Sequence, residues 1–148
     1  NVNVTRLVIQ NGGAGGFIDI TQNARRIVFS GTLTGGGLDI TLDSGHLRVE
    51  KEGKIQKFVP RVNQISFSGR KAIGDDVNVT FVTERAVFRL MDHGIEISEV
   101  APGIDIERDV LSQIPFSISV PKTVKLMDHR IFLDGPMGIR DEILSRVH

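Results

Sequence analysis

A cluster of glycines near the start of the chain separates a strand pattern from an apolar segment. Residues 11–21 read NGGAGGFIDIT and hold four glycines within five positions. Glycine adopts backbone conformations that side chains forbid and lets the backbone approach another group closely. Residues 1–6 alternate as in a strand, and residues 17–24 fit either a strand or a helix. We favour a short helix, because residues 26–30 form a better strand and need a crossover before it.

Composition limits the classes of protein to consider. The chain has 148 residues, of which 40% are hydrophobic and 24% charged, and its 18 basic residues balance its 18 acidic ones. These values predict one globular domain without an internal boundary and give no sign of a nucleic-acid partner. No apolar run is long enough to cross a bilayer, so no membrane partner is expected. The absence of cysteine excludes disulfides and thiolate metal sites, and we expect a cytoplasmic protein.

The start of the chain indicates a piece of something longer. The sequence begins with Asn1 rather than methionine, and its first five residues read as the middle of a strand. We therefore expect functional groups to lie on a segment before Asn1.

Turn residues divide the following segment into a predicted meander. Apolar residues alternate in residues 38–42, 47–49 and 55–59, with turns expected at Ser44–Gly45 and Glu52–Gly53. Residues 63–69, NQISFSG, are predicted as a strand that ends in glycine. Together, the predicted strands and helices indicate an α/β domain with an antiparallel meander inserted in its sheet.

The second half of the chain continues this alternation. Residues 77–83 predict a strand, and residues 86–100 predict a hairpin that turns at His93–Gly94. Asp105 is suited to cap a helix. Residues 115–121 predict a strand between two prolines, and after a Gly135–Pro136 turn a short terminal helix would use Ile139, Ile143 and Val147.

The glycine cluster supports two interpretations. Unpaired N–H groups at a helix N-terminus can cradle a phosphate or stabilise an oxyanion. The alternative is a flexible surface turn. The stretch has no Gly-Lys-Ser/Thr end, and Ile18 stands where a Gly-x-Gly-x-x-Gly motif needs its last glycine.

Other candidate residues carry weaker signals. Glu84 follows a strand and could act as nucleophile or base, although Arg85 beside it offers a plain ion pair. The glycines of residues 32–37 are expected to form a turn, and the paired basic residues at 25–26 and 70–71 are expected to be solvated. The four histidines lack metal-ligand spacing, so no metal site is predicted. Ser30 and Ser68 precede glycine but lack the flanks of a nucleophilic serine.

Taken together, several segments resemble one enzyme family. They are NVNVT, GGAGGFIDITQNARRIVFSGTLTGGGL, EGKIQKFVPRVNQISFSG, VTERAVFRL and EVAPGIDIERDVLSQIPF, spread over residues 1–133. In order and spacing they resemble the C-terminal part of family I coenzyme A transferases of the acetate/propionate type. The resemblance implies an open α/β sheet like that of the NagB/RpiA-like proteins, within the glutamate-bearing, beta-subunit-like domain.

The resemblance also implies a reaction. These enzymes move CoA from an acyl-CoA to a short-chain carboxylate through an acyl-glutamyl anhydride and a glutamyl-CoA thioester, with no permanently bound cofactor. The nucleophilic glutamate lies in a turn well before NVNVT and is absent here, so Glu84 is interpreted as structural. The expected partners are acyl-CoA, the acid, the rest of the enzyme or a partner subunit, and further copies of the full protein. A non-catalytic nucleotide-binding or assembly module is the alternative.

The resemblance gives the glycine loop a role. It places an oxyanion-hole backbone N–H at Gly16 and a CoA-binding turn at Gly13, Ala14 and Gly15. A thioester carbonyl that becomes tetrahedral gathers negative charge on its oxygen, which such a donor stabilises. The residues before the loop, LVIQN, differ from the glycine-rich lead-in usual in the family.

Overall fold

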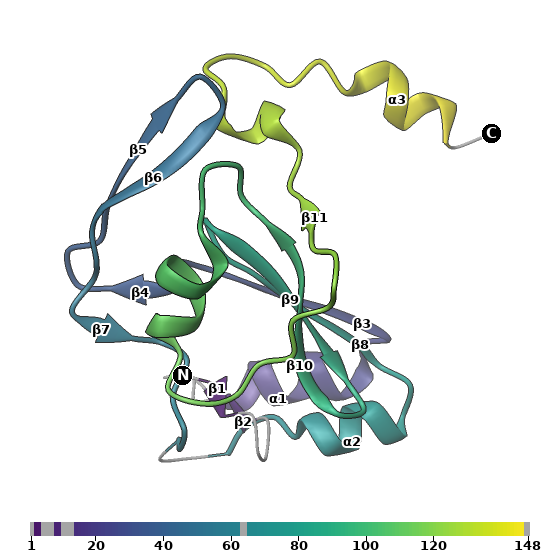
Figure 1. Ribbon diagram of the computed structural model, residues 1–148. Helices are drawn as coiled ribbons and strands as arrows, with labels where there is room; N and C mark the ends of the chain where they lie inside the picture. The colour runs from purple at the N-terminus through teal and green to yellow at the C-terminus, as the bar shows by residue number, and fades with distance from the viewer. Residues whose placement is uncertain (1, 4–7, 10–13, 63–64, 147–148) are drawn as a thin grey trace.

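One mixed sheet organises the chain (Figure 1). The computed structural model describes residues 2–3, 8–9, 14–62 and 65–146, with side chains described from residue 16 onward. The elements of the first half are β1 (Val2–Asn3), β2 (Val8–Ile9), α1 (Ala14–Asn23), β3 (Arg26–Ser30), β4 (Thr34–Gly35), β5 (Asp39–Asp43), β6 (His46–Lys51) and β7 (Ile55–Gln56). The later elements are α2 (Gly69–Gly74), β8 (Asn78–Val82), β9 (Ala86–Met91), β10 (Gly94–Val100), η1 (Ile106–Val110), η2 (Leu111–Gln113), β11 (Lys125–Leu126), η3 (His129–Phe132) and α3 (Arg140–Ser145).

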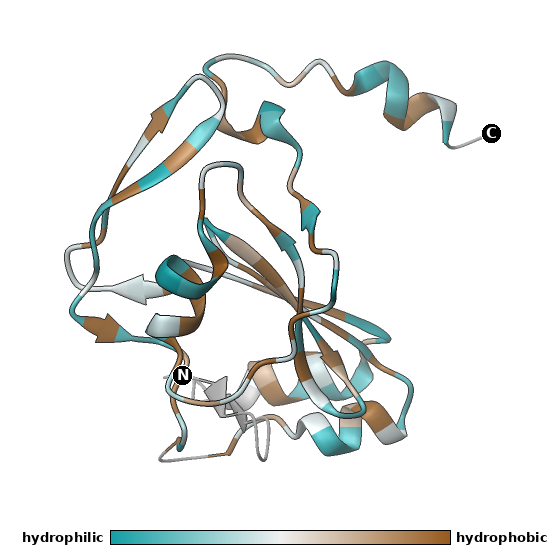
Figure 2. Cartoon of the chain, viewed as in Figure 1, coloured by the Kyte–Doolittle hydropathy of each residue, from teal (hydrophilic) through white to brown (hydrophobic). Residues whose placement is uncertain are grey.

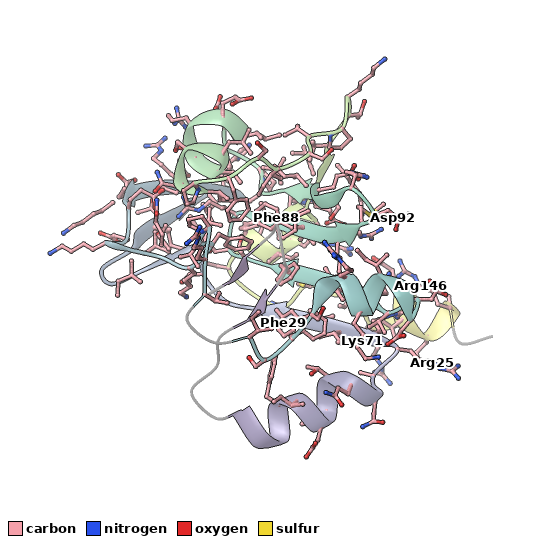
Figure 3. All side chains as sticks on the ribbon, turned by 90° about the horizontal axis from the view of Figure 1, so that it is seen from below. Arg25, Phe29, Lys71, Phe88, Asp92 and Arg146 are labelled. Carbon is pink, nitrogen blue, oxygen red and sulfur yellow. The ribbon has the colours of Figure 1, made fainter. Side chains whose placement is uncertain are left out.

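The five-stranded sheet has the order β11-β10-β9-β8-β3. β3 pairs parallel with β8, the strands β8, β9 and β10 form an antiparallel meander, and β11 returns parallel to β10. Helices α1 and α2 lie on one side of the sheet and the η1–η2 turn on the other (Figures 1 and 3). This arrangement confirms the predicted α/β class. Among the described helices, none combines the length and the apolar character that a membrane crossing needs.

Phenylalanines form the centre of the core. The sheet strands carry much of the hydrophobic sequence (Figure 2). Ring contacts run from Phe29 to Phe81, from Phe81 to Phe58 and from Phe58 to Phe88, with centroids 5.3, 6.1 and 5.1 Å apart. Phe17 of α1 joins this chain through Phe29 at 6.0 Å. Each such pair contributes about 0.5–1.5 kcal/mol beyond its buried area, so the rings fix α1 against the sheet.

Many of the elements predicted from the sequence are confirmed. Helix α1 is present but begins at Ala14, within the glycine cluster and three residues before the predicted start, and β3, β8 and the β9–β10 hairpin lie where alternation predicted them. Asp105 caps η1, because its side chain accepts a hydrogen bond from the Arg108 N–H at 2.8 Å. The terminal helix α3 includes Ile143, whereas Val147 lies outside the described residues.

Three predicted strands are wrong in detail. Of the predicted meander, only β5 and β6 form the expected hairpin. The third strand, β7, pairs antiparallel with β4, because the backbones at Gly35 and Gly53 cross at close range. Residues 65–68 are not a strand, and Ser68 caps α2 through a 3.3 Å bond from the Lys71 N–H; Asn63 and Gln64 lie outside the described residues. Residues 115–121 supply a single parallel bridge, from Ser119 to Glu96, rather than a strand.

The segment between β3 and β8 leaves the sheet and is fixed at two places. Its β5–β6 ribbon extends away from the sheet (Figure 1). The Leu47 N–H donates to the Pro102 carbonyl at 2.8 Å, and Leu47 packs with Val87, Met127 and Phe132 in a small second core. Its base is joined to the sheet by charged side chains, described below.

Candidate functional site

The glycine cluster leads directly into α1. Ala14 and Gly15 are the first two residues of this helix and Gly16 is the third; Gly13 lies outside the described residues. The first N–H groups of a helix have no acceptor within it. Gly16 is exposed, and no described atom lies within 4 Å of the position that a Cβ would take. The Gly16 backbone therefore combines an N–H without a helical acceptor and open space around it.

The opposite side of the first helical turn is anchored. Phe17 packs on Phe29, and Figure 3 shows Phe29 between α1 and the rest of the sheet. Thr21 is buried, and its hydroxyl donates to the Phe17 carbonyl at 2.9 Å. These contacts hold the start of α1 in place while Gly16 stays accessible.

A pocket opens at the ends of β3 and β8, close to this anchor. The two parallel strands are in register, with Phe29 opposite Phe81 and Ser30 opposite Val82. A cavity of about 130 Å³ lies where they end. Its lining residues are Phe29, Ser30, Gly31, Thr32, Lys57, Phe58, Phe81, Val82 and Thr83. Ligands of open α/β sheets bind outside the carboxyl ends of parallel strands, so this position is suited to a substrate.

Lys57 provides the charge of this pocket. Its ammonium donates to the Thr32 hydroxyl at 2.6 Å, and that hydroxyl donates to the Thr34 carbonyl at 2.6 Å. Lysine carries three donors. Among the described residues, the Lys57 side chain has this one hydrogen bond and no ion pair. Sequence reasoning missed Lys57, because a lone lysine in a strand pattern gives no signal of its own.

A second polar cluster joins the base of the β5–β6 segment to the sheet. The Arg85 side chain is fully buried and donates through Nε to Glu84 at 2.6 Å, through both terminal nitrogens to Glu52, and to the Asp109 carbonyl at 2.8 Å. Burial lowers the pKa of Arg85, but hydrogen bonds and charge from Glu52 and Glu84 outweigh it and raise that pKa overall. The cluster keeps a buried cation matched by two carboxylates.

Glu84 is fully engaged in this cluster. One carboxylate oxygen accepts from Arg85, and the other accepts from the Leu33 N–H at 2.8 Å. Its side chain is 11% exposed. The ion pair predicted for Glu84 and Arg85 is confirmed, and neither oxygen points to an open site. The participation of Glu52, 33 residues earlier, could not be predicted from local sequence.

The remaining sequence candidates are the paired basic residues and the second glycine cluster. Arg25, Arg26, Arg70 and Lys71 are exposed, which confirms the expected solvation, and Lys71 pairs with Asp75. Gly36 and Gly37, in the predicted glycine turn, have φ of 74° and 98°. No set of three or more histidine and carboxylate side chains within the described ranges could hold a metal ion.

A larger cavity lies between α1 and α2. It measures about 240 Å³, and Ile18, Thr21, Phe67 and Lys71 are among its lining residues. Ser68, weighed above as a nucleophile, also lines it, but Ser68 caps α2 and Lys71 pairs with Asp75.

Comparison with known proteins agrees with the fold. The chain is homologous to coenzyme A transferases, which confirms the family resemblance found in its sequence. It is 41% identical over 126 residues to the acetate CoA-transferase YdiF of Escherichia coli K12, covering 85% of this chain and 24% of that protein. It is 35% identical over 151 aligned positions to the caffeate CoA-transferase of Acetobacterium woodii, covering 99% of this chain and 28% of that protein. No protein-family model matches the chain.

Solved structures give the same result. The crystal structure of the acyl-CoA transferase YdiF apoenzyme from E. coli O157:H7 superposes with a TM-score of 0.86 at 37% identity, over 93% of this chain and 28% of that one. A thioester complex of the same protein with CoA matches equally well. The chain thus spans about a quarter of the length of these relatives.

Proposed function

We propose that this chain is part of an acyl-CoA:carboxylate CoA-transferase that works through a glutamyl-CoA thioester. The observation that carries the proposal is the homology to two named CoA-transferases over 85% and 99% of the chain. A related protein has been crystallised as a thioester complex with CoA. In this proposal the chain is the C-terminal portion of the glutamate-bearing domain, and residues 1–148 form one unit of it.

The chain supplies the oxyanion loop in this proposal, and a preceding segment supplies the nucleophilic glutamate. Gly16 donates its backbone N–H to the thioester carbonyl, and Gly13, Ala14 and Gly15 shape the turn that contacts CoA. The position of Gly16 in the first turn of α1, with open space around it, supports this role. One such donor contributes about 3–4 kcal/mol to transition-state stabilisation in comparable sites. The engagement of Glu84 with Arg85 supports a nucleophile elsewhere.

The wider context follows from the same proposal. Acyl-CoA and a short-chain carboxylic acid are the substrates, and no cofactor is bound permanently. The chain works only with the rest of the enzyme or a partner subunit, in a cytoplasmic assembly of two or more copies.

Trapping of the covalent intermediate tests the proposed function. The gene that encodes this chain should be expressed over its full length and incubated with an acyl-CoA. The expected result is a glutamyl-CoA thioester that borohydride reduces and that mass spectrometry locates before residue 1 of this chain. A full-length protein that acyl-CoA leaves unmodified would reject the proposal and favour a non-catalytic nucleotide-binding or assembly module.

A further inference from the structure

We propose that the pocket at the ends of β3 and β8 binds the short-chain carboxylic acid, with Lys57 holding the carboxylate and Phe29, Phe58 and Phe81 holding the hydrocarbon part. This proposal rests on the proposed function, because it names where one substrate of that reaction binds. It identifies a site that would determine which acid the enzyme accepts, and the homology does not identify such a site.

The walls of the pocket suit a small amphiphilic anion. Three phenylalanines, from β3, β8 and the segment after β7, are among the residues that line it. Such a surface favours a few methylene groups over water. Lys57 adds a single cation, and its only hydrogen-bond partner in the described part of the chain is the neutral hydroxyl of Thr32. An apolar interior with one cation fits a carboxylate that has a short alkyl tail.

The size of the pocket suits a small ligand. Sites for drug-sized molecules usually enclose about 300–1,000 Å³, whereas this cavity measures about 130 Å³. The nucleotide half of CoA is therefore too large for it. A carboxylic acid with a few carbon atoms is small enough to fit.

Contacts between rings connect the pocket to the glycine loop. Phe29 lines the pocket and also packs on Phe17, the residue directly after Gly16. Helix α1 runs back toward β3 through a short turn, so the first turn of the helix and the last residues of β3 lie at the same end of the sheet. An acid held by Lys57 thus lies at the end of the sheet where the proposed oxyanion donor is found.

Binding of butyrate to variants of the full-length enzyme tests this assignment. Lys57→Met should weaken butyrate binding about 10- to 100-fold, since a hydrogen-bonded charge is lost. Competition by butyramide, which has the same shape without the charge, should stay unchanged. Lys57→Arg should restore most of the butyrate affinity. Lys54→Met is the matched control, because Lys54 is exposed on the same segment and does not line the pocket.

A second variant probes the pocket from another residue. A Cβ on Gly31 would lie 3.8 Å from the Lys57 ammonium, an ordinary contact that leaves the backbone undisturbed. Gly31→Ala should narrow the mouth and weaken butyrate binding several-fold more than acetate binding. Calorimetry or ligand-observed NMR measures these affinities without turnover.

The outcomes separate the two proposals. If the wild-type enzyme forms the glutamyl-CoA thioester but Lys57→Met and Gly31→Ala bind butyrate as the wild type does, the pocket assignment is wrong and the proposed function stands. If the wild type forms no thioester, the proposed function itself fails. Equal loss of butyrate and butyramide binding in Lys57→Met would indicate a structural role for Lys57 and would also overturn the assignment.

Discussion

Two glycines in this chain serve opposite purposes. At Gly16, in the first turn of α1, the space where a Cβ would lie is open. At Gly53, in the base of the β5–β6 segment, a Cβ would lie 2.7 Å from the Gly35 nitrogen and still closer to the Gly35 carbonyl oxygen. The first glycine lies beside open space, and the second leaves room for the chain itself. A glycine in a sequence therefore does not show by itself whether the space beside it is open or filled by another part of the chain.

The polar groups around the two glycines differ in the same way. Near Gly53, the Gly53 N–H donates to the Thr34 hydroxyl at 3.1 Å, and that hydroxyl donates to Glu52, which binds Arg85. Among the side chains that the structure describes, no buried nitrogen or oxygen atom lacks a partner. Near Gly16 the backbone donors of the first turn have no helical acceptor. Full pairing is typical of a structural region, and unpaired donors in open space are typical of a binding region.

Removal of the buried cation should give the largest effect on stability. Arg85→Met leaves Glu52 and Glu84 without their partner, and breaking a buried ion pair costs about 3–5 kcal/mol. Chemical denaturation of the full-length protein measures this loss. Adding Glu52→Gln and Glu84→Gln to Arg85→Met should recover part of it, because the two unpaired charges, one largely buried at Glu84 and one partly buried at Glu52, then disappear. A loss below 1 kcal/mol in the single variant would show that the cluster does not support the fold.

Removal of the proposed oxyanion donor should abolish turnover with little effect on folding. Gly16→Pro deletes an N–H that the helix does not use, so the helix is expected to survive while transfer falls about 100- to 1,000-fold. Steady-state transfer rates and the far-ultraviolet circular dichroism spectrum test both parts. Gly16→Ala keeps the donor and should lose less activity than the proline variant. Unchanged turnover in Gly16→Pro would reject the role of this residue.

The crowded glycine should respond to a single methyl group. Gly53→Ala forces the backbones at Gly35 and Gly53 apart, and overpacking of this kind costs about 1–3 kcal/mol. Gly74→Ala is the matched control, since no described atom lies within 4 Å of a Cβ at Gly74. The control should change the free energy of unfolding by less than about 0.5 kcal/mol or increase it. Equal effects at the two positions would remove the contrast between open and crowded glycines.

A surface ion pair should give the smallest effect. Arg130 donates to Asp128 and Glu142, and its hydrogen bonds lower the pKa of Asp128 to about 2, from an ordinary 3.8. A lowered folded-state pKa means that the stabilisation is present above about pH 4 and is lost as the pH falls toward 2. Exposed pairs contribute little, so Asp128→Asn should flatten the acid limb of a thermal-unfolding profile only slightly. A steeper acid limb in that variant would contradict this assignment.

The sequence predicted local structure better than it predicted pairings between distant segments. Alternation identified β3, β8 and the β9–β10 hairpin, and the glycines marked the start of α1, because these patterns lie within a few residues. The partner of β7 was predicted wrongly, since the crossing of Gly35 and Gly53 depends on residues 18 positions apart, and Ile55 alternates as a hairpin strand would. Residues 65–68 have the composition of a strand, yet Ser68 starts a helix because its side chain caps it.

The candidate site shows the same difference between local patterns, which the sequence reveals, and contacts between distant segments, which it does not. Gly16 could be proposed from the sequence because glycine clusters are visible there, and the family resemblance suggested its role, which stays a prediction. Lys57 could not be found, because its meaning depends on Thr32 and on the ends of two strands that only the fold brings together. The partnership of Arg85 with Glu52 is also a product of the fold.

The parallel pairing of β3 with β8 has a consequence for how the chain acquires its structure. Arg26 pairs with Asn78, and the same separation of 52 positions holds for every pair of these strands. The β8–β9–β10 meander, in contrast, joins neighbours along the chain. Because distant pairings must first overcome the entropy of closing a long loop, we expect the meander to form early and β3 to join it last. Pulsed hydrogen exchange should therefore protect the amides of β9 before those of β3, and the pocket between β3 and β8 should exist only after the final step of folding.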